Sequence, residues 1–171
     1  LSRAQSNTQK FDFVGIKEGI SKVGIYTIVQ DDQGFIWLGT NGAGLYRFDG
    51  LNFESYKYVI DDSTSLSSSL VMSSHMDGQK NLWFGTEDGL NLYDRKQNHF
   101  ERIPNESFDH LSTANISISS LEEDLNGNLF IGTLGYGMFK MDVSSRKVEK
   151  VLSKESLESL SLNVNSISKD I

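Results

Sequence analysis

The sequence contains no cysteine, and no apolar run in it approaches the roughly 20 residues that a membrane-spanning helix needs. Without cysteine, disulfides, thiolate catalysis and cysteine-ligated structural zinc are all excluded. The sequence also lacks the sustained three-and-four spacing of apolar residues that marks amphipathic helices. These absences favour a soluble all-β protein, and they leave its redox compartment open.

The charge balance is acidic. Sixteen Lys and Arg residues stand against 23 Asp and Glu residues, which gives a net charge of -7 and a pI near 4.9. An acidic surface repels phosphate instead of releasing counterions from it, so we expect no contact of this chain with nucleic acid. At 171 residues the chain is long enough for one domain with a hydrophobic core.

Motifs for metal or phosphate chemistry are missing as well. The histidines His75, His99 and His110 follow no zinc-site spacing, and we expect them to be solvated or without a functional role. The Gly-rich turns at Gly42 and Gly135 lack the lysine and helix that a phosphate-binding loop requires. We therefore expect no metal, no cofactor and no catalytic residue in this chain.

One segment recurs along the sequence. It reads DDQGFIWLGTNGAGL from Asp31, DGQKNLWFGTEDGL from Asp77 and DLNGNLFIGTLGYGM from Asp124, at spacings of 46 and 47 residues, and Asp170 lies a further 46 residues on. Each unit contains four short strand-like stretches separated by turn residues. A period in the mid-forties with four strands predicts a β-propeller with one four-stranded antiparallel blade per repeat.

The repeat divides the chain into parts. We expect a leader remnant or frayed terminus at 1–10, an outer strand of a closing blade at 11–14, blade 1 at 25–56, blade 2 at 70–103, blade 3 at 116–151 and the inner strand of a fourth blade at 162–171. About three blades plus two orphan strands cannot close a ring that typically has four to eight blades. We therefore expect this chain to be a partial propeller, a fragment of a longer protein.

Several positions repeat in every unit. Trp37, Trp83 and Phe130 share one position, which predicts packing between adjacent sheets, while a sugar-stacking platform is the functional alternative. The other repeated positions are Gly39, Gly85 and Gly132, each followed by Thr, and the aspartates Asp31, Asp77, Asp124 and Asp170. The glycines suit close backbone approach, and the aspartates suit turn support, with metal binding as their alternative.

Ligand contacts are expected in the variable loops. In a four-stranded blade the turn between the second and third strands opens on the same side as the connector to the next blade. The polar candidates on these segments for contacts to a neutral ligand such as a glycan are Asn41, Asp61, Asp62, Glu87, Asp88, Asp109 and Tyr136. The alternative is that these loops are merely solvated.

The units QDDQGFIWLGTNGAGLYRFDGLNFESY, KNLWFGTEDGLNLYDRKQNHFERI and GNLFIGTLGYGMFKMD resemble the two-component regulator propeller repeat. Departures from that repeat are Phe130 in place of Trp and the turn DGQK in the second unit. The resemblance implies a seven-bladed propeller in the N-terminal periplasmic region of a hybrid histidine kinase of the kind common in Bacteroidetes. Such proteins sense oligosaccharides from complex glycans and control polysaccharide-utilisation genes.

The resemblance also implies a homodimeric full-length protein, tethered to the inner membrane through residues outside this chain, and no enzymatic activity in this segment. Two alternatives come from other classes of protein. One is a fragment of a propeller enzyme of the lyase or dehydrogenase type, and the other is a non-catalytic assembly scaffold.

Overall fold

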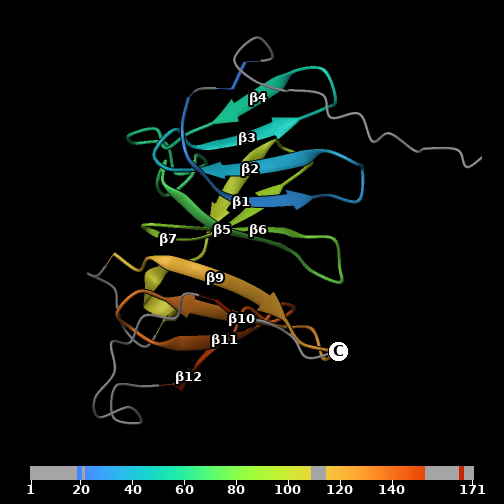
Figure 1. The fold of residues 1–171 in the computed structure, drawn as a ribbon. Helices are drawn as coiled ribbons and strands as arrows, with labels where there is room; N and C mark the ends of the chain where they lie inside the picture. The colour runs from blue at the N-terminus through green and yellow to red at the C-terminus, as the bar shows by residue number, and fades with distance from the viewer. Residues whose placement is uncertain (1–18, 21, 109–114, 153–165, 168–171) are drawn as a thin grey trace, which may run out of the picture.

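A computed structural model describes residues 19–20, 22–108, 115–152 and 166–167. These residues form three four-stranded antiparallel sheets, each a simple meander in which strands adjacent in sequence are adjacent in space. Figure 1 shows the three sheets following one another as successive layers. The all-β prediction and the prediction of four-stranded antiparallel blades are therefore confirmed.

Blade 1 shows why these residues form short strands. Its strands are β1 Ile25–Gln30, β2 Ile36–Thr40, β3 Leu45–Phe48 and β4 Phe53–Tyr56. All four are rich in β-branched and aromatic side chains, which pack well on a pleated surface. The turns between them use residues that accept a left-handed backbone, such as Gly34, Gly44 and Gly50 at φ values of +90°, +90° and +99°.

Blades 2 and 3 repeat this plan. Blade 2 consists of β5 Val71–Met76, β6 Leu82–Thr86, β7 Gly89–Asp94 and β8 His99–Arg102. Blade 3 consists of β9 Ile118–Glu123, β10 Asn128–Thr133, β11 Met138–Asp142 and β12 Val148–Leu152, and a 3-10 turn at Asn105–Ser107 precedes it. The second strand of each blade ends in the Gly-Thr pair that the repeat contains.

The hydrophobic core lies between blades. One cluster joins blade 1 to blade 2 and includes Trp37, Leu45, Val71, Phe84 and Phe100. The other joins blade 2 to blade 3 and includes Trp83, Leu90, Ile118, Leu129 and Phe139. Because each sheet buries its apolar face against the next sheet, one blade depends on its neighbour for its core.

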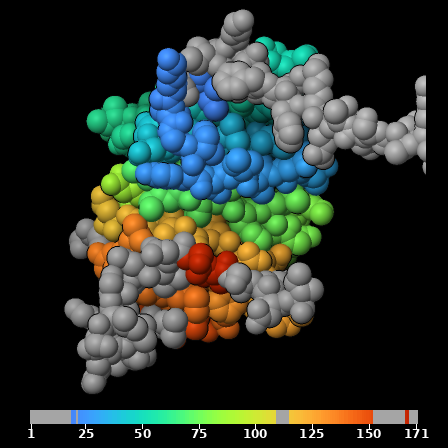
Figure 2. All heavy atoms as spheres, in the orientation of Figure 1, coloured from blue at the N-terminus to red at the C-terminus, as the bar shows by residue number. Residues whose placement is uncertain are grey.

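Polar contacts hold the inner strands together. The Thr27 hydroxyl of blade 1 lies 2.6 Å from the Ser74 hydroxyl of blade 2, and the Ser73 hydroxyl donates to the Ile118 carbonyl of blade 3 at 3.0 Å. The space-filling view in Figure 2 shows the three blades as blue, green and orange bands in direct contact. The inner strands thus fix the spacing between consecutive sheets.

The proposed outer strand at 11–14, Asp109 and Asp170 lie outside the described residues, as does nearly all of the proposed inner strand at 162–171. Within the described ranges, no helix is long and apolar enough to cross a lipid bilayer.

Candidate functional site

A buried aspartate organises the first turn of each of the first two blades. Asp77 Oδ1 accepts the backbone N–H groups of Gln79 and Asn81, both at 2.9 Å, and its Oδ2 accepts the Trp83 indole N–H at 2.7 Å. Asp31 Oδ2 likewise accepts the Trp37 indole N–H at 3.0 Å. The aspartate thereby links the turn to the core tryptophan. This bond was not predicted from the sequence, although the aspartate and the tryptophan are six residues apart in both blades.

The further bonding partner of this carboxylate differs between the blades. In blade 2 the Asn81 side-chain amide donates to Asp77 Oδ2 at 2.8 Å, and in blade 3 the Asn128 amide donates to Asp124 Oδ2 at the same distance. Blade 1 has Phe35 at that position, which offers no side-chain donor. Blade 2 supplies a cation to this carboxylate instead, because the Arg95 guanidinium lies 3.9 Å from Asp31 Oδ2.

The aromatic ring positions differ in burial. Trp37 and Trp83 are fully buried, and Trp37 lies 4.7 Å from Tyr93 and 5.4 Å from Phe84 of the next blade, measured between ring centroids. Phe130 is only partly buried. Its sheet is the last one in the described part of the chain, so the described residues place no further blade against this face.

The loops chosen from the sequence do share one end of the blades. The turn after β2 is joined to the connector before β5 by the bond from Gly44 N–H to the Ser69 carbonyl, at 2.8 Å. In blade 2 the Glu87 N–H donates to the Leu70 carbonyl at 3.1 Å, and in blade 3 the Leu134 N–H donates to the Ser117 carbonyl at 2.9 Å. Backbone bonds between turn and connector thus recur at this end of all three blades.

The structure separates the individual candidates at this end. Asn41, Asp61 and Glu87 are exposed. Tyr136 is partly buried against the core between blades 2 and 3, and Asp88 lines a hollow of about 220 Å³ together with residues of the following connector. The structure therefore does not gather these candidates into one cluster.

Asp62 serves its own loop. Its carboxylate accepts the Thr64 hydroxyl at 2.6 Å and the Thr64 N–H at 2.8 Å, and these hydrogen bonds hold the pKa of Asp62 below its ordinary value of 3.8. A carboxylate held in this way stabilises the turn around it. The structure thus gives the Asp62 side chain a local bonding role within the connector.

Arg102 clamps the same connector, which the sequence did not indicate. Its guanidinium donates to the carbonyls of Asp62, Ser65 and Leu66 at 2.7, 3.0 and 3.1 Å. It also stands over the Tyr58 ring, with the guanidinium carbon 5.6 Å from the ring centroid. The fixed fork of an arginine suits several carbonyls at once, so β8 holds the connector between blades 1 and 2 in place.

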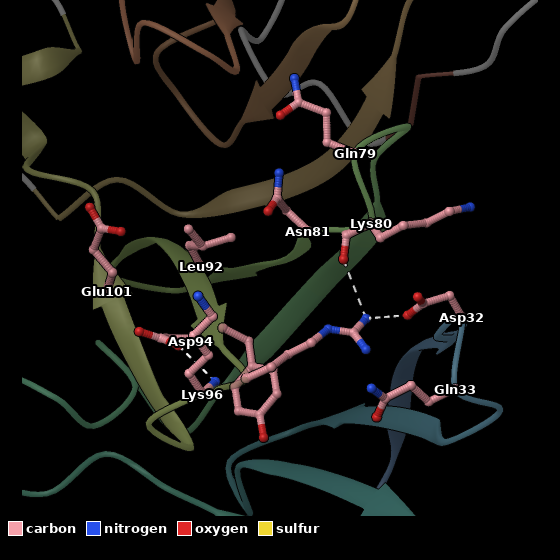
Figure 3. A pocket seen from close by; sticks show the side chains of 11 residues that line it. Asp32, Gln33, Gln79, Lys80, Asn81, Leu92, Asp94, Lys96 and Glu101 are labelled. Carbon is pink, nitrogen blue, oxygen red and sulfur yellow. Dashed lines mark hydrogen bonds and ion pairs between the residues drawn. The ribbon is translucent and has the colours of Figure 1, made fainter.

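A larger hollow, of about 470 Å³, opens at the opposite end of the blades. The turn after β1 supplies Asp32 and Gln33, the turn after β5 supplies Gln79, Lys80 and Asn81, and the end of β7 and the turn after it supply Asp94, Arg95 and Lys96. Figure 3 shows Asp32 of blade 1 near Lys80 of blade 2, with dashed lines that mark interactions at both residues. These interactions are made by Arg95, which pairs with Asp32 at 2.7 Å and donates to the Lys80 carbonyl at 3.3 Å.

A third hollow lies along the inner strands. Tyr26, Met72 and Ser119, which occupy equivalent positions of β1, β5 and β9, line about 310 Å³ together with Leu134. None of these side chains carries a charge. The hollow therefore offers little for orienting a polar ligand.

The described residues contain no group of three or more His, Asp or Glu side chains placed to hold a metal ion. Of the three histidines, His110 lies outside the described residues, and His75 departs from the solvated state that the sequence predicted. His75 Nε2 is buried without a hydrogen-bond partner among the described residues, while His99 Nε2 lies 3.9 Å from Asp94 Oδ2. His75 follows the strand alternation of β5, whose pairing places it opposite Trp83.

The sequence is similar to known proteins of two-component systems. Residues 19–42 match the family model described as two component regulator propeller. Over 89 residues, or 49% of this chain, the sequence is 35% identical to Histidine kinase P4 of Formosa agariphila. The match covers only 6% of that kinase, so the chain spans a small part of its length.

Solved structures of other proteins share the fold of this chain. The extracellular domain of BT3049 from B. thetaiotaomicron, described as a hybrid two component system, matches 89% of this chain and 21% of its own length, with 26% identity and a TM-score of 0.75. The extracellular domain of BT4673 from the same organism matches 92% of the chain and 20% of its own length, with 24% identity and a TM-score of 0.69.

The two sets of matches agree on the kind of protein to which the chain is related. Its all-β sheets follow the propeller-like arrangement of these extracellular domains, and the residues at the start of blade 1 match the repeat model. The described chain is thus a run of three propeller blades that carries a two component regulator propeller repeat and is similar to the extracellular domains of two-component sensors.

Proposed function

We propose that this chain is a ligand-sensing segment in the extracytoplasmic region of a hybrid two-component sensor histidine kinase. The observation that carries the proposal is its similarity to the BT3049 extracellular domain, at 26% identity over 89% of the chain. The similarity to Histidine kinase P4 of Formosa agariphila supports the same assignment. In this proposal the segment lies in the periplasm and is tethered to the inner membrane through other residues of the full-length protein.

The proposed ligand is an oligosaccharide released from a complex glycan, and the proposed output is control of polysaccharide-utilisation genes. Polar, hydrogen-bonding side chains at both ends of the blades support a hydroxyl-rich ligand, since hydroxyl groups need both donors and acceptors. Among the loop candidates, Asp88 has the firmest support because it lines a hollow. Asn41, Asp61, Asp62, Glu87, Asp109 and Tyr136 remain proposed contacts.

Signal transfer needs a ligand that binds two arrangements of the protein with different affinity. We propose that the full-length sensor is a homodimer and that ligand binding shifts the relative position of its two subunits. The kinase reaction belongs to other parts of that protein, and this segment contributes recognition without catalysis. Neighbouring blades share their hydrophobic cores, so a displacement at one blade is passed to the next.

Thermal-shift titration of the complete extracytoplasmic region against an oligosaccharide panel tests this function. A ligand that binds only the folded state adds about 2.7 kcal/mol to the free energy of unfolding when its concentration is one hundred times its Kd. This added stability raises the Tm. We expect at least one oligosaccharide to raise the Tm in a concentration-dependent way. No shift with any glycan would count against the sensor, and conversion of a glycan into product would favour the propeller-enzyme alternative.

A further inference from the structure

The hollow between blades 1 and 2 at the end opposite the predicted loops has the features of a binding site (Figure 3). Its volume of about 470 Å³ falls in the range of small-molecule sites in proteins. Turns of both blades supply its walls, and binding residues are often found on loops that a rigid scaffold positions. The hollow on the loop side is about half as large, at about 220 Å³.

The charges around this hollow cancel. Lys80, Arg95 and Lys96 supply three positive groups, and Asp32, Asp94 and Glu101 supply three negative groups. Several of these charges are already engaged: Arg95 pairs with Asp32 at 2.7 Å, and Glu101 lies 3.8 Å from Arg146. Because the positive and negative groups are equal in number, the hollow has no net charge that would attract an ionic ligand more than a neutral one.

Its polar groups suit hydroxyls. The side-chain amide of Gln33 offers donors and an acceptor. The amides of Gln79 and Asn81 already donate to Ser144 and Asp77, and each keeps its carbonyl oxygen and a second N–H for a ligand. Leu92 and Tyr93 add a small apolar surface. Amides arranged beside apolar surface favour a molecule that carries many hydroxyl groups on an apolar ring. A neutral sugar fits that description.

Arg95 gives the site a link to the fold. It extends from the β7–β8 turn of blade 2, donates to the Lys80 carbonyl and pairs with Asp32 of blade 1. It also lies 3.9 Å from Asp31, the carboxylate that holds the Trp37 indole. A ligand that hydrogen-bonds Arg95 therefore touches the group that joins the two blades at this end.

We infer that this hollow is a binding site for a neutral, hydroxyl-rich ligand of the size of a small oligosaccharide, with Gln33 and Arg95 among its contacts. The inference rests on the proposed function and deepens it, because it locates the ligand at the end of the blades opposite the loops that the sequence favoured. Occupancy of the site bridges blades 1 and 2 and so depends on their relative position.

Hydrogen exchange of the complete extracytoplasmic region, measured with and without ligand, locates the site. The probes are the neutral trisaccharides maltotriose, cellotriose, xylotriose and mannotriose, with trigalacturonic acid as an anionic comparison. We expect a neutral trisaccharide to slow exchange in the turns at 31–35, 77–81 and 94–98. Slowed exchange at 41–44, 57–65 and 87–89 instead would overturn this site while leaving the sensor proposal intact.

Substitutions supply a second readout. We expect Gln33→Ala and Arg95→Gln each to weaken binding of the trisaccharide by about tenfold or more, with Gln33→Ala leaving the fold unchanged because Gln33 is exposed. The matched control is Gln97→Ala, whose side chain belongs to the same β7–β8 turn but does not line the hollow. Unchanged affinity in both test variants would overturn the site. Binding of trigalacturonic acid alone would overturn the neutral ligand class, and binding of no trisaccharide would contradict both proposals.

Discussion

The aspartate that begins each repeat is the residue on which the local structure of a blade depends most. Asp77 accepts two backbone N–H groups of its turn, the Asn81 amide and the Trp83 indole. A carboxylate has four lone-pair sites and no donor, so it can satisfy all four groups. The turn and the core tryptophan of the blade are thereby fixed by one side chain.

Replacing Asp77 by Asn tests this role. The amide of Asn would turn an N–H₂ group toward donors that now face a carboxylate oxygen, and those buried donors would lose their acceptor. We expect Asp77→Asn to lower the free energy of unfolding by about 2–4 kcal/mol, measured by urea denaturation.

The control for this variant is Asp61→Asn. Asp61 is exposed and has a φ of 61°, a conformation that Asn adopts readily, so we expect a change within about 0.5 kcal/mol. Equal effects of the two substitutions would show that the loss of a charge, and not the loss of the buried acceptor, is what matters.

Aspartates in the exposed turns make stability depend on pH. Hydrogen bonds from the Ser145 backbone and hydroxyl lower the pKa of Asp142 from its ordinary value of 3.8. Because the folded pKa is depressed, this group stabilises the fold above pH 3.8, and that contribution is lost as pH falls through the lower folded pKa.

We therefore expect Asp142→Asn to lose less stability than the unchanged protein when the pH is lowered from neutrality to below 3.8, measured as urea unfolding at each pH. Ser145→Ala removes one of the donors and should give an intermediate result. Parallel pH profiles for the unchanged protein and Asp142→Asn would contradict the assignment.

At the scale of the strands, the close approach of neighbouring blades depends on the glycines near the ends of β2 and β6, Gly39 and Gly85. A Cβ on Gly39 would lie 2.5 Å from Thr27 Cγ2 and 2.8 Å from Val71 Cγ1 of the next blade. A Cβ on Gly85 would overlap the Ser73 hydroxyl and lie 2.6 Å from Ile118 Cγ2. Because Gly39 has no side chain, β5 can lie close to β2, and because Gly85 has none, β9 can lie close to β6.

We expect Gly85→Ala to lower the free energy of unfolding by about 1–3 kcal/mol, because the added methyl group pushes against two strands that belong to different blades. Thermal unfolding followed by circular dichroism measures the loss. Gly78→Ala is the control, since a Cβ there meets only the flexible Glu123 carboxylate at 3.4 Å. A loss at Gly85 no larger than that at Gly78 would contradict this packing argument.

At the scale of the whole molecule, cores between blades make each blade depend on the next one. Trp83 is fully buried against blade 3, whereas Phe130, its counterpart in blade 3, is partly buried. We expect Trp83→Ala to cost about 3–5 kcal/mol in the 171-residue chain and Phe130→Ala to cost clearly less.

The cost of Phe130→Ala should also depend on the length of the chain. If further repeats follow in the full-length protein, the next blade should cover Phe130, and the cost of Phe130→Ala should rise toward that of Trp83→Ala. Urea unfolding of both variants in the short and the extended chain measures the difference. An equal cost of Phe130→Ala in both lengths would contradict a neighbouring blade at this face.

Much of the fold follows from the repeat alone. The spacing of 46 and 47 residues between Asp31, Asp77 and Asp124 and the four strand-like stretches per unit predict antiparallel blades of a propeller. These features are local: turn residues, strand alternation and recurrence are all visible along the chain. The end at which the second-to-third turns meet the connectors also follows, because strands alternate in direction.

The contacts between blades follow only from the tertiary structure. Arg95 reaches Asp32 and the carboxylate of Asp31 from the neighbouring blade, and Arg102 clamps a connector about 40 residues earlier in the chain. Nothing in a single repeat specifies these pairs, because Arg95 has no arginine at the corresponding position of the other units. The sequence directed attention to the loops, whereas side-chain packing between blades decided that the larger hollow lies at the opposite end.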